Sequence, residues 1–162
     1  MFKIKTKFYF DKGLKIAVDQ EVLRYYMWQI ARGPHDTLGQ QTPMRKAHIS
    51  VILPRIHGGE ITELSRQFDG HEVEVTCDGD IHQGGSWFTN YWVMFQCSHA
   101  TYIKKLLGVR EKNFLGYHLT ICNNKGRINE LYPEAAILAK EMNDGRYNVD
   151  EYRQKMLNLV KK

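Results

Sequence analysis

Alternating apolar and polar residues predict a β-hairpin at the start of the chain. Over Phe2–Phe10, aromatic and aliphatic residues alternate largely with lysines, which is the two-residue period of a strand with one buried face. Asp11–Gly13 supplies a turn, and Leu14–Val18 resumes the alternation. Two alternating segments joined by a short turn are typical of antiparallel partners.

Helical and strand-like segments interleave along the rest of the chain. Asp19 is a suitable N-cap for a helix over 20–32, which Gly33-Pro34 ends. Further helices are predicted at 60–68, from Ser98 to 107, at 133–142 and at 149–160, and further strands at 47–53, 71–77, 88–97 and 117–122. The sequence predicts a long loop over residues 33–43 and turns at 78–79 and 123–126. This mixture predicts an α+β or mixed α/β fold in one domain, 1–162.

Composition restricts the class of protein. Of 162 residues, 43% are hydrophobic and 25% charged, an ordinary globular balance. No apolar run approaches the roughly 18 residues that span a bilayer, and the first residues lack the apolar stretch of a signal peptide. Three cysteines without C-x-x-C spacing favour a reducing cytoplasm and disfavour a disulfide scaffold or a zinc site. We therefore expect neither metal nor cofactor.

The charge changes sign along the chain. Residues 1–50 carry 9 basic and 4 acidic groups, 51–100 carry 2 and 7, and 101–162 carry 12 and 7. This distribution favours a cleft for a small anion over a duplex-binding surface, which needs a denser basic stripe. Arg45 and Lys46 are the better candidates to guide an anion, whereas Lys104 and Lys105 are expected on a solvated helix face. His57 is expected to be an ordinary surface or strand histidine.

Two predicted strands contain the same short motif. His48-Ile49-Ser50-Val51 and His118-Leu119-Thr120-Ile121 both alternate polar and aliphatic residues. Since successive side chains in a strand point to opposite faces, each motif places an imidazole and a hydroxyl together and buries the aliphatic residues. The structural alternative for either motif alone is a partly buried histidine that its neighbours satisfy. The repetition favours a functional pair.

Such a pair suits phosphodiester cleavage without a metal. One neutral imidazole takes a proton from the attacking oxygen, and one imidazolium protonates the leaving oxygen. Histidine populates both forms near neutral pH. The hydroxyls of Ser50 and Thr120 would donate hydrogen bonds to the phosphoryl oxygens. The sequence does not distinguish the acid from the base.

The paired His-x-Ser/Thr strands resemble the signature of the two-histidine (2H) phosphoesterases. The resemblance implies a two-lobed α+β fold with pseudo-twofold repeated strand motifs that line a central cleft, and a catalytic quartet of His48, Ser50, His118 and Thr120. Serine at position 50 departs from the commoner threonine but keeps the hydroxyl. Within the family, the segments Gly84-Gly85-Ser86-Trp87 and Tyr117-His118-Leu119-Thr120 make the chain similar to the anti-CBASS phosphodiesterases of tailed phages.

The resemblance also implies a substrate and a biological setting. Those phage enzymes degrade cyclic di- and trinucleotide signals of a bacterial defence system, which places them in the host cytoplasm. The ribose 2′-hydroxyl would attack the adjacent 3′–5′ linkage without a metal. Alternatives are a 2′,3′-cyclic phosphodiesterase or 2′–5′ RNA-end processing enzyme, and a noncatalytic nucleotide-binding sponge. Base preference, ring size and homo-oligomerisation are left open.

Four residues are candidates for binding the bases of such a substrate. Trp87 follows a glycine-rich segment that could close it over a base, and Tyr147 and Tyr9 are further stacking candidates. Glu141 could accept a base amino group. The structural alternatives are the start of a buried strand for Trp87 and an exposed helix end for Tyr147 and Glu141.

Overall fold

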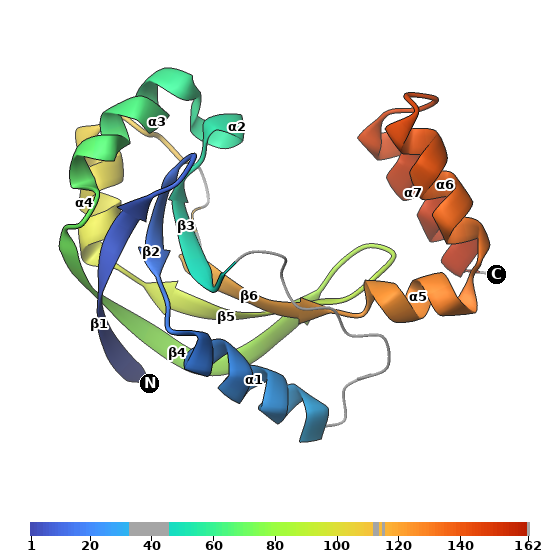
Figure 1. Cartoon of the computed structure of the whole chain (residues 1–162), viewed down its shortest axis with the longest axis horizontal. Coiled ribbons are helices and arrows are strands. Elements are labelled where there is room, and N and C mark those ends of the chain that lie inside the picture. Colours follow the sequence, from blue (N-terminus) through green and yellow to red (C-terminus); the bar gives the residue numbers. More distant parts are fainter. Residues whose placement is uncertain (33–45, 112–113, 115, 162) are drawn as a thin grey trace. The chain divides into compact units, whose positions relative to one another are not determined.

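The computed structural model describes residues 1–32, 46–111, 114 and 116–161, and Figure 1 shows their secondary structure. The chain forms two compact units. The first comprises Met1–Tyr25, Pro43–His82 and Trp92–Thr120, and the second Tyr26–Thr42, Gln83–Tyr91 and Ile121–Lys162. Within the described residues, no helix combines the length and the apolar character needed to cross a bilayer.

The described residues form six strands and seven α-helices, so the fold is α+β, as predicted. The strands are β1 (Phe2–Phe10), β2 (Leu14–Ala17), β3 (His48–Ile52), β4 (Glu72–Gly84), β5 (Asn90–Gln96) and β6 (Tyr117–Asn123). The helices are α1 (Gln20–Arg32), α2 (Pro54–His57), α3 (Gly59–Ser65), α4 (Ser98–Leu106), α5 (Lys125–Leu131), α6 (Glu134–Asn143) and α7 (Val149–Val160). A 3₁₀ turn, Arg66–Phe68, follows α3.

The strands form one sheet in the order β3-β2-β1-β4-β5-β6. The element order strand–strand–helix–strand occurs twice, as β1-β2-α1-β3 and as β4-β5-α4-β6. The two copies meet at the centre of the sheet, where β1 pairs with β4 in antiparallel fashion. The last strand of each copy therefore becomes an edge of the sheet, and each edge carries one histidine motif.

One face of the sheet forms the core of the first unit. Alternate residues on adjacent strands pair across it, for instance Phe8 with Ile16 and Ile16 with Ile49, all of them fully buried. Helix α4 covers this face, since its Ala100 and Ile103 are buried and its first turn places His99 edge-on against Phe8. The opposite face carries the polar residues of each strand.

The second unit has a smaller core of its own. Trp87, Ala135 and Met156 are buried there, and aromatic and aliphatic residues of α5, α6 and α7 pack against them. Asn124 links two of its segments, because its side-chain oxygen accepts the backbone N–H of Thr89 at 2.7 Å and its own N–H donates to the Thr89 carbonyl.

Several local predictions are confirmed and others are wrong. The hairpin, α1 and α7 lie where the pattern predicts them, and the Asp19 carboxylate accepts the N–H of Glu21 at 2.9 Å. The predicted turn at 78–79 lies inside β4, which continues to Gly84 because Gly79 adopts a φ of 88° that glycine tolerates without strain. The predicted turn at 123–126 gives way to α5. The predicted loop 33–43 lies outside the described residues.

The histidine strand β3 depends on its buried aliphatic residues. Ile49 is fully buried between the two polar residues of the motif, so Ile49→Ala should lower the free energy of unfolding by about 2–5 kcal/mol, through lost apolar contacts and a residual cavity. Chemical denaturation followed by circular dichroism measures this value. Ile56→Ala, at a side chain that is 61% exposed, is the control, and equal losses in the two variants would contradict the assignment of the core face.

Candidate active site

Both histidine motifs line one small cavity in the first unit. Its walls are Lys46, Ala47, His48, Ser50, His118 and Thr120, and it encloses about 50 Å³. Four of these residues are the predicted catalytic quartet. Since β3 and β6 are the two edges of the sheet, a shared cavity means that the sheet curves until its edges approach each other, and Figure 1 shows β3 beside β6.

The first histidine is held by its own strand. His48 Nδ1 lies 2.7 Å from the carbonyl oxygen of Lys46, so Nδ1–H donates to this oxygen and Nε2 is left for proton transfer. The start of β3 is fixed in turn, because the Ala47 N–H donates to the side-chain oxygen of Gln20 at 2.7 Å. The imidazole therefore has a defined tautomer and orientation before any substrate binds.

The second histidine is biased toward its neutral form. His118 is the exposed residue of the otherwise largely buried strand β6, but desolvation of its ring and the positive charge of His48 both lower the pKa of His118 below its ordinary value. Each effect disfavours the imidazolium. The two residues line the same cavity, which is the geometric basis of this interaction.

The two hydroxyls of the quartet are available for a ligand. Ser50 and Thr120 are half-buried in the cavity wall, and neither hydroxyl has a hydrogen-bond partner within the described part of the chain. Free hydroxyl donors beside two imidazoles are suited to the non-bridging oxygens of a phosphodiester.

A second cavity, of about 250 Å³, shares Ser50 and His118 with the first. It contains an ionic cluster that the sequence reasoning missed: the carboxylate oxygens of Glu111 lie 2.6 Å from His57 Nε2 and 2.8 Å from Lys104 Nζ. Burial alone would raise the pKa of the Glu111 carboxyl, but the hydrogen bonds from Lys104 and His57 lower it. The expectation of a solvated Lys104 is therefore wrong, because its side chain is only 10% exposed.

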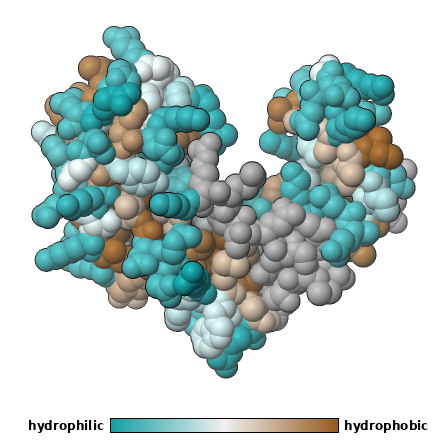
Figure 2. All heavy atoms as spheres, viewed as in Figure 1, coloured by the Kyte–Doolittle hydropathy of each residue, from teal (hydrophilic) through white to brown (hydrophobic). Residues whose placement is uncertain are grey.

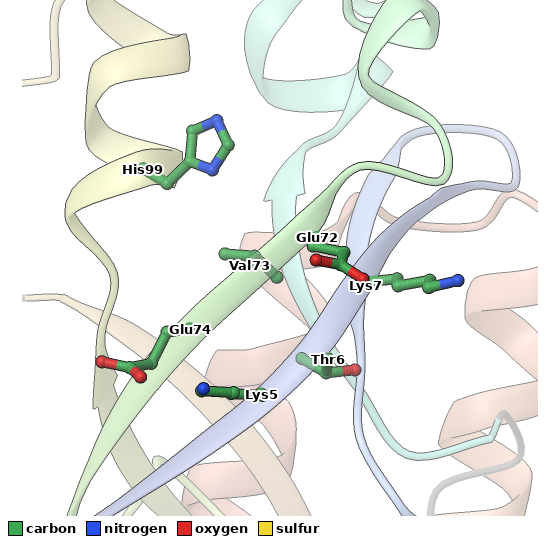
Figure 3. A pocket seen from close by; sticks show the side chains of 7 residues that line it. All are labelled: Lys5, Thr6, Lys7, Glu72, Val73, Glu74 and His99. Atoms are coloured by element: carbon green, nitrogen blue, oxygen red, sulfur yellow. The ribbon is translucent and has the colours of Figure 1, made fainter.

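A larger hollow in the same unit is balanced in charge and lies away from the motifs. Figure 3 shows its lining residues on β1, β4 and the first turn of α4. In the register of these strands, Lys5 lies opposite Glu74 and Lys7 opposite Glu72. Opposite charges on facing strands stabilise a sheet. This hollow contains no histidine besides His99, whose ring packs on Phe8.

The predicted base-binding residues have different surroundings. Tyr9 lies on β1 and lines a hollow together with His48 and Lys46. Trp87 is 6% exposed and belongs to the core of the second unit. The Tyr147 hydroxyl lies 3.0 Å from a carboxylate oxygen of Glu141, which also forms an ion pair with Arg146. Trp87 is therefore buried, as its structural alternative expects, but it lies before β5, which begins at Asn90, and does not start a strand. Base binding by these residues stays a prediction.

The described residues include no group of three or more His, Cys, Asp or Glu side chains placed to hold a metal ion. The three cysteines are buried, and none of them forms a disulfide within the described residues. Comparisons with protein-family models, with curated proteins and with solved structures find no match to this chain. The assignment of a function therefore depends on the site itself.

Electrostatic coupling between the two histidines leads to a testable pH dependence. In His48→Ala the positive neighbour is absent, so the pKa of His118 should rise but should stay below the ordinary histidine value, because its burial persists. NMR titration of the imidazole Cε1–H signal of His118 measures its pKa in the wild type and in His48→Ala. His71→Ala, at an exposed histidine outside the cavity, should leave the His118 titration unchanged. An unchanged pKa in His48→Ala would contradict the coupling.

Proposed function

We propose that this protein is a metal-independent phosphodiesterase that opens cyclic di- and trinucleotides through acid–base catalysis by His48 and His118. The observation that carries the proposal is the single cavity lined by two imidazoles and by two hydroxyls that have no hydrogen-bond partner among the described residues, from opposite edges of the sheet. A space of about 50 Å³ suits a phosphoryl group rather than a whole nucleotide. The nucleosides on either side would then extend into the adjoining hollows.

The asymmetry of the pair supports an assignment of roles. His118, whose pKa is lowered, is the general base and takes the proton of the ribose 2′-hydroxyl as this oxygen attacks phosphorus. His48, oriented by the Lys46 carbonyl, is the general acid and donates its Nε2 proton to the leaving 5′-oxygen. The products are a 2′,3′-cyclic phosphate and a free 5′-hydroxyl, and the two imidazoles have exchanged protonation states.

Charge develops on the non-bridging oxygens during this step. The hydroxyls of Ser50 and Thr120 donate hydrogen bonds to these oxygens. These hydrogen bonds become shorter and stronger as the charge on the oxygens increases. A positive cavity rim at Lys46 attracts the anionic substrate. In a phage-infected bacterium, this reaction would remove a cyclic-nucleotide alarm and counter CBASS immunity.

Either catalytic histidine should be essential. His48→Ala and His118→Ala should each lower kcat on a cyclic dinucleotide by at least ~100-fold, because general acid or base catalysis typically contributes that much. Chromatographic separation of intact ring from opened product measures the rate. His71→Ala is the matched control, with an unchanged rate expected. Recovery of intact ligand from the wild-type protein would instead favour a nucleotide-binding sponge.

Turnover should not depend on a divalent cation, because in this mechanism the proton transfers and the stabilisation of charge come from side chains. Dialysis against EDTA should leave kcat/KM within about twofold of the untreated protein, and its pH profile should be bell-shaped. Loss of activity in EDTA that a divalent ion restores would refute the mechanism. A panel that includes linear RNA with 2′,3′-cyclic phosphate ends tests the RNA-end alternative.

A further inference from the structure

We propose that a lysine-lined hollow beside His48 binds a second phosphate group of the substrate, distinct from the one being cleaved. This hollow, the lysine hollow, is lined by Tyr9, Asp11, Lys12, Lys15, Lys46 and His48 and has a volume of about 520 Å³. It shares Lys46 and His48 with the catalytic cavity. The inference rests on the proposed function for the identity of the substrate, but not for the presence of an anion site.

The central residue is Lys15 on β2. In the strand register, Lys15 lies directly opposite Tyr9 on one side and Ser50 on the other. Cross-strand neighbours share a face of the sheet, so Lys15 belongs to the same polar face as the catalytic hydroxyl of Ser50. Its position is therefore fixed by two strand pairings rather than by a mobile loop.

Burial makes this lysine unusual. Lys15 is 2% exposed, whereas lysine is almost never fully buried without a partner. Its nearest carboxylate oxygen, on Asp11, lies 3.8 Å away and belongs to a side chain that is 68% exposed. Among the described residues, the ammonium donates no hydrogen bond. Its Nζ also lies 6.0 Å from the centroid of the Tyr9 ring. No fully buried side-chain polar atom of the described residues lacks a hydrogen-bond partner, so Nζ keeps some contact with the hollow. A largely buried cation that has only a long ion pair and borders a hollow is suited to an anion.

The neighbouring residues increase the positive charge. Lys12 and Lys46 line the same hollow, and Asp11 is its only acidic lining residue within the described part of the chain. Lys12 also has a φ of 56°, and non-glycine residues in this region concentrate at functional sites. By contrast, Lys5 and Lys7 on β1 lie opposite glutamates (Figure 3). The excess of positive charge therefore distinguishes the lysine hollow from the hollow between β1 and β4.

Phosphate is the ligand class that this arrangement fits best. Lysine ammonium groups bind phosphate oxygens as compact point charges, and a hollow adjacent to the scissile group can hold the next phosphate along the ring. A cyclic dinucleotide carries two phosphodiesters, whereas a nucleoside 2′,3′-cyclic phosphate carries one. The hollow therefore selects substrates with a second phosphate.

Inorganic phosphate is the first probe. The lysine Cε–H NMR signals of the full chain are titrated with phosphate and, at equal ionic strength, with chloride. We expect the Lys15 signal to shift saturably with phosphate alone, and Lys15→Met to weaken phosphate binding at least tenfold. Lys5→Met, which removes an equal charge from an exposed site, should bind as the wild type does. Absence of a saturable shift, or the same loss in both variants, would overturn the subsite.

Steady-state kinetics then identify the source of the phosphate. With a cyclic dinucleotide, Lys15→Met should raise KM at least tenfold and change kcat less than threefold, and Lys15→Arg should recover part of the loss. With the dinucleoside monophosphate ApA, which has one phosphodiester, both parameters should stay unchanged. An equal effect on the two substrates would overturn the assignment to a second phosphate.

The two experiments separate this inference from the proposed function. If the wild-type protein cleaves neither substrate, the proposed function fails, and the phosphate titration still decides whether the lysine hollow binds an anion. A linear dinucleotide with a 5′-phosphate, pApA, distinguishes a terminal phosphate from a ring phosphate. A loss of affinity in Lys15→Met that is confined to pApA would refute selection of the cyclic substrate.

Discussion

The approach of the two sheet edges is the constraint on which the candidate active site depends. His48 and His118 lie on strands that are separated by four others in the sheet order, so a flat sheet would keep them far apart. Strong twisting and curvature of the six-stranded sheet bring its edges together, so that both motifs line the same cavity. Because side chains alternate in a strand, a slip of one residue in either edge would turn its histidine into the core.

The same curvature explains the electrostatics of the polar face. Curvature brings the side chains of the concave face close together and so reduces their contact with water, as for Lys15 on β2, which is 2% exposed. It also accounts for the lowered pKa of His118, which burial and the charge of His48 produce together. Positive groups thus gather in a partly dehydrated space, where their mutual repulsion is relieved when an anion binds. On the face shown in Figure 2, the coloured residues are mainly hydrophilic, with scattered apolar side chains.

The sequence predicts the parts whose signals are local. Each of these signals consists of a few adjacent residues: the alternation in β1 and β2, the cap at Asp19 and the two histidine motifs. The structure has all of them where the sequence predicts them. Prediction from the sequence fails where a contact between distant residues determines the local structure. The helix α5 replaces a predicted turn at a point where Asn124 is fixed by hydrogen bonds to Thr89. Gly79 resembles a turn residue but extends a strand.

Residues that come together only through topology are the hardest to find from sequence. Lys104 and Glu111 are separated by the end of a helix, and His57 comes from another element, so their cluster has no local pattern. Lys15 has one partial signal: it stands between Leu14 and Ile16, which are buried on the core face. This pattern identifies the opposite face, but only the pairing with Ser50 shows that the face belongs to the site.

The repeated strand–strand–helix–strand order gives matched positions to groups that must behave differently. A symmetric pair of imidazoles would have equal affinities for the proton, whereas catalysis needs one base and one acid at the same time. The copies differ in their neighbours: β2 presents Lys15 beside the first motif, whereas β5, next to the second, has Trp92, Met94 and Gln96 between its buried residues. The first histidine also has a carbonyl partner through Lys46. The repeat therefore supplies the geometry, and the lowered pKa of His118, which burial and the charge of His48 cause, supplies the asymmetry that the proposed reaction requires.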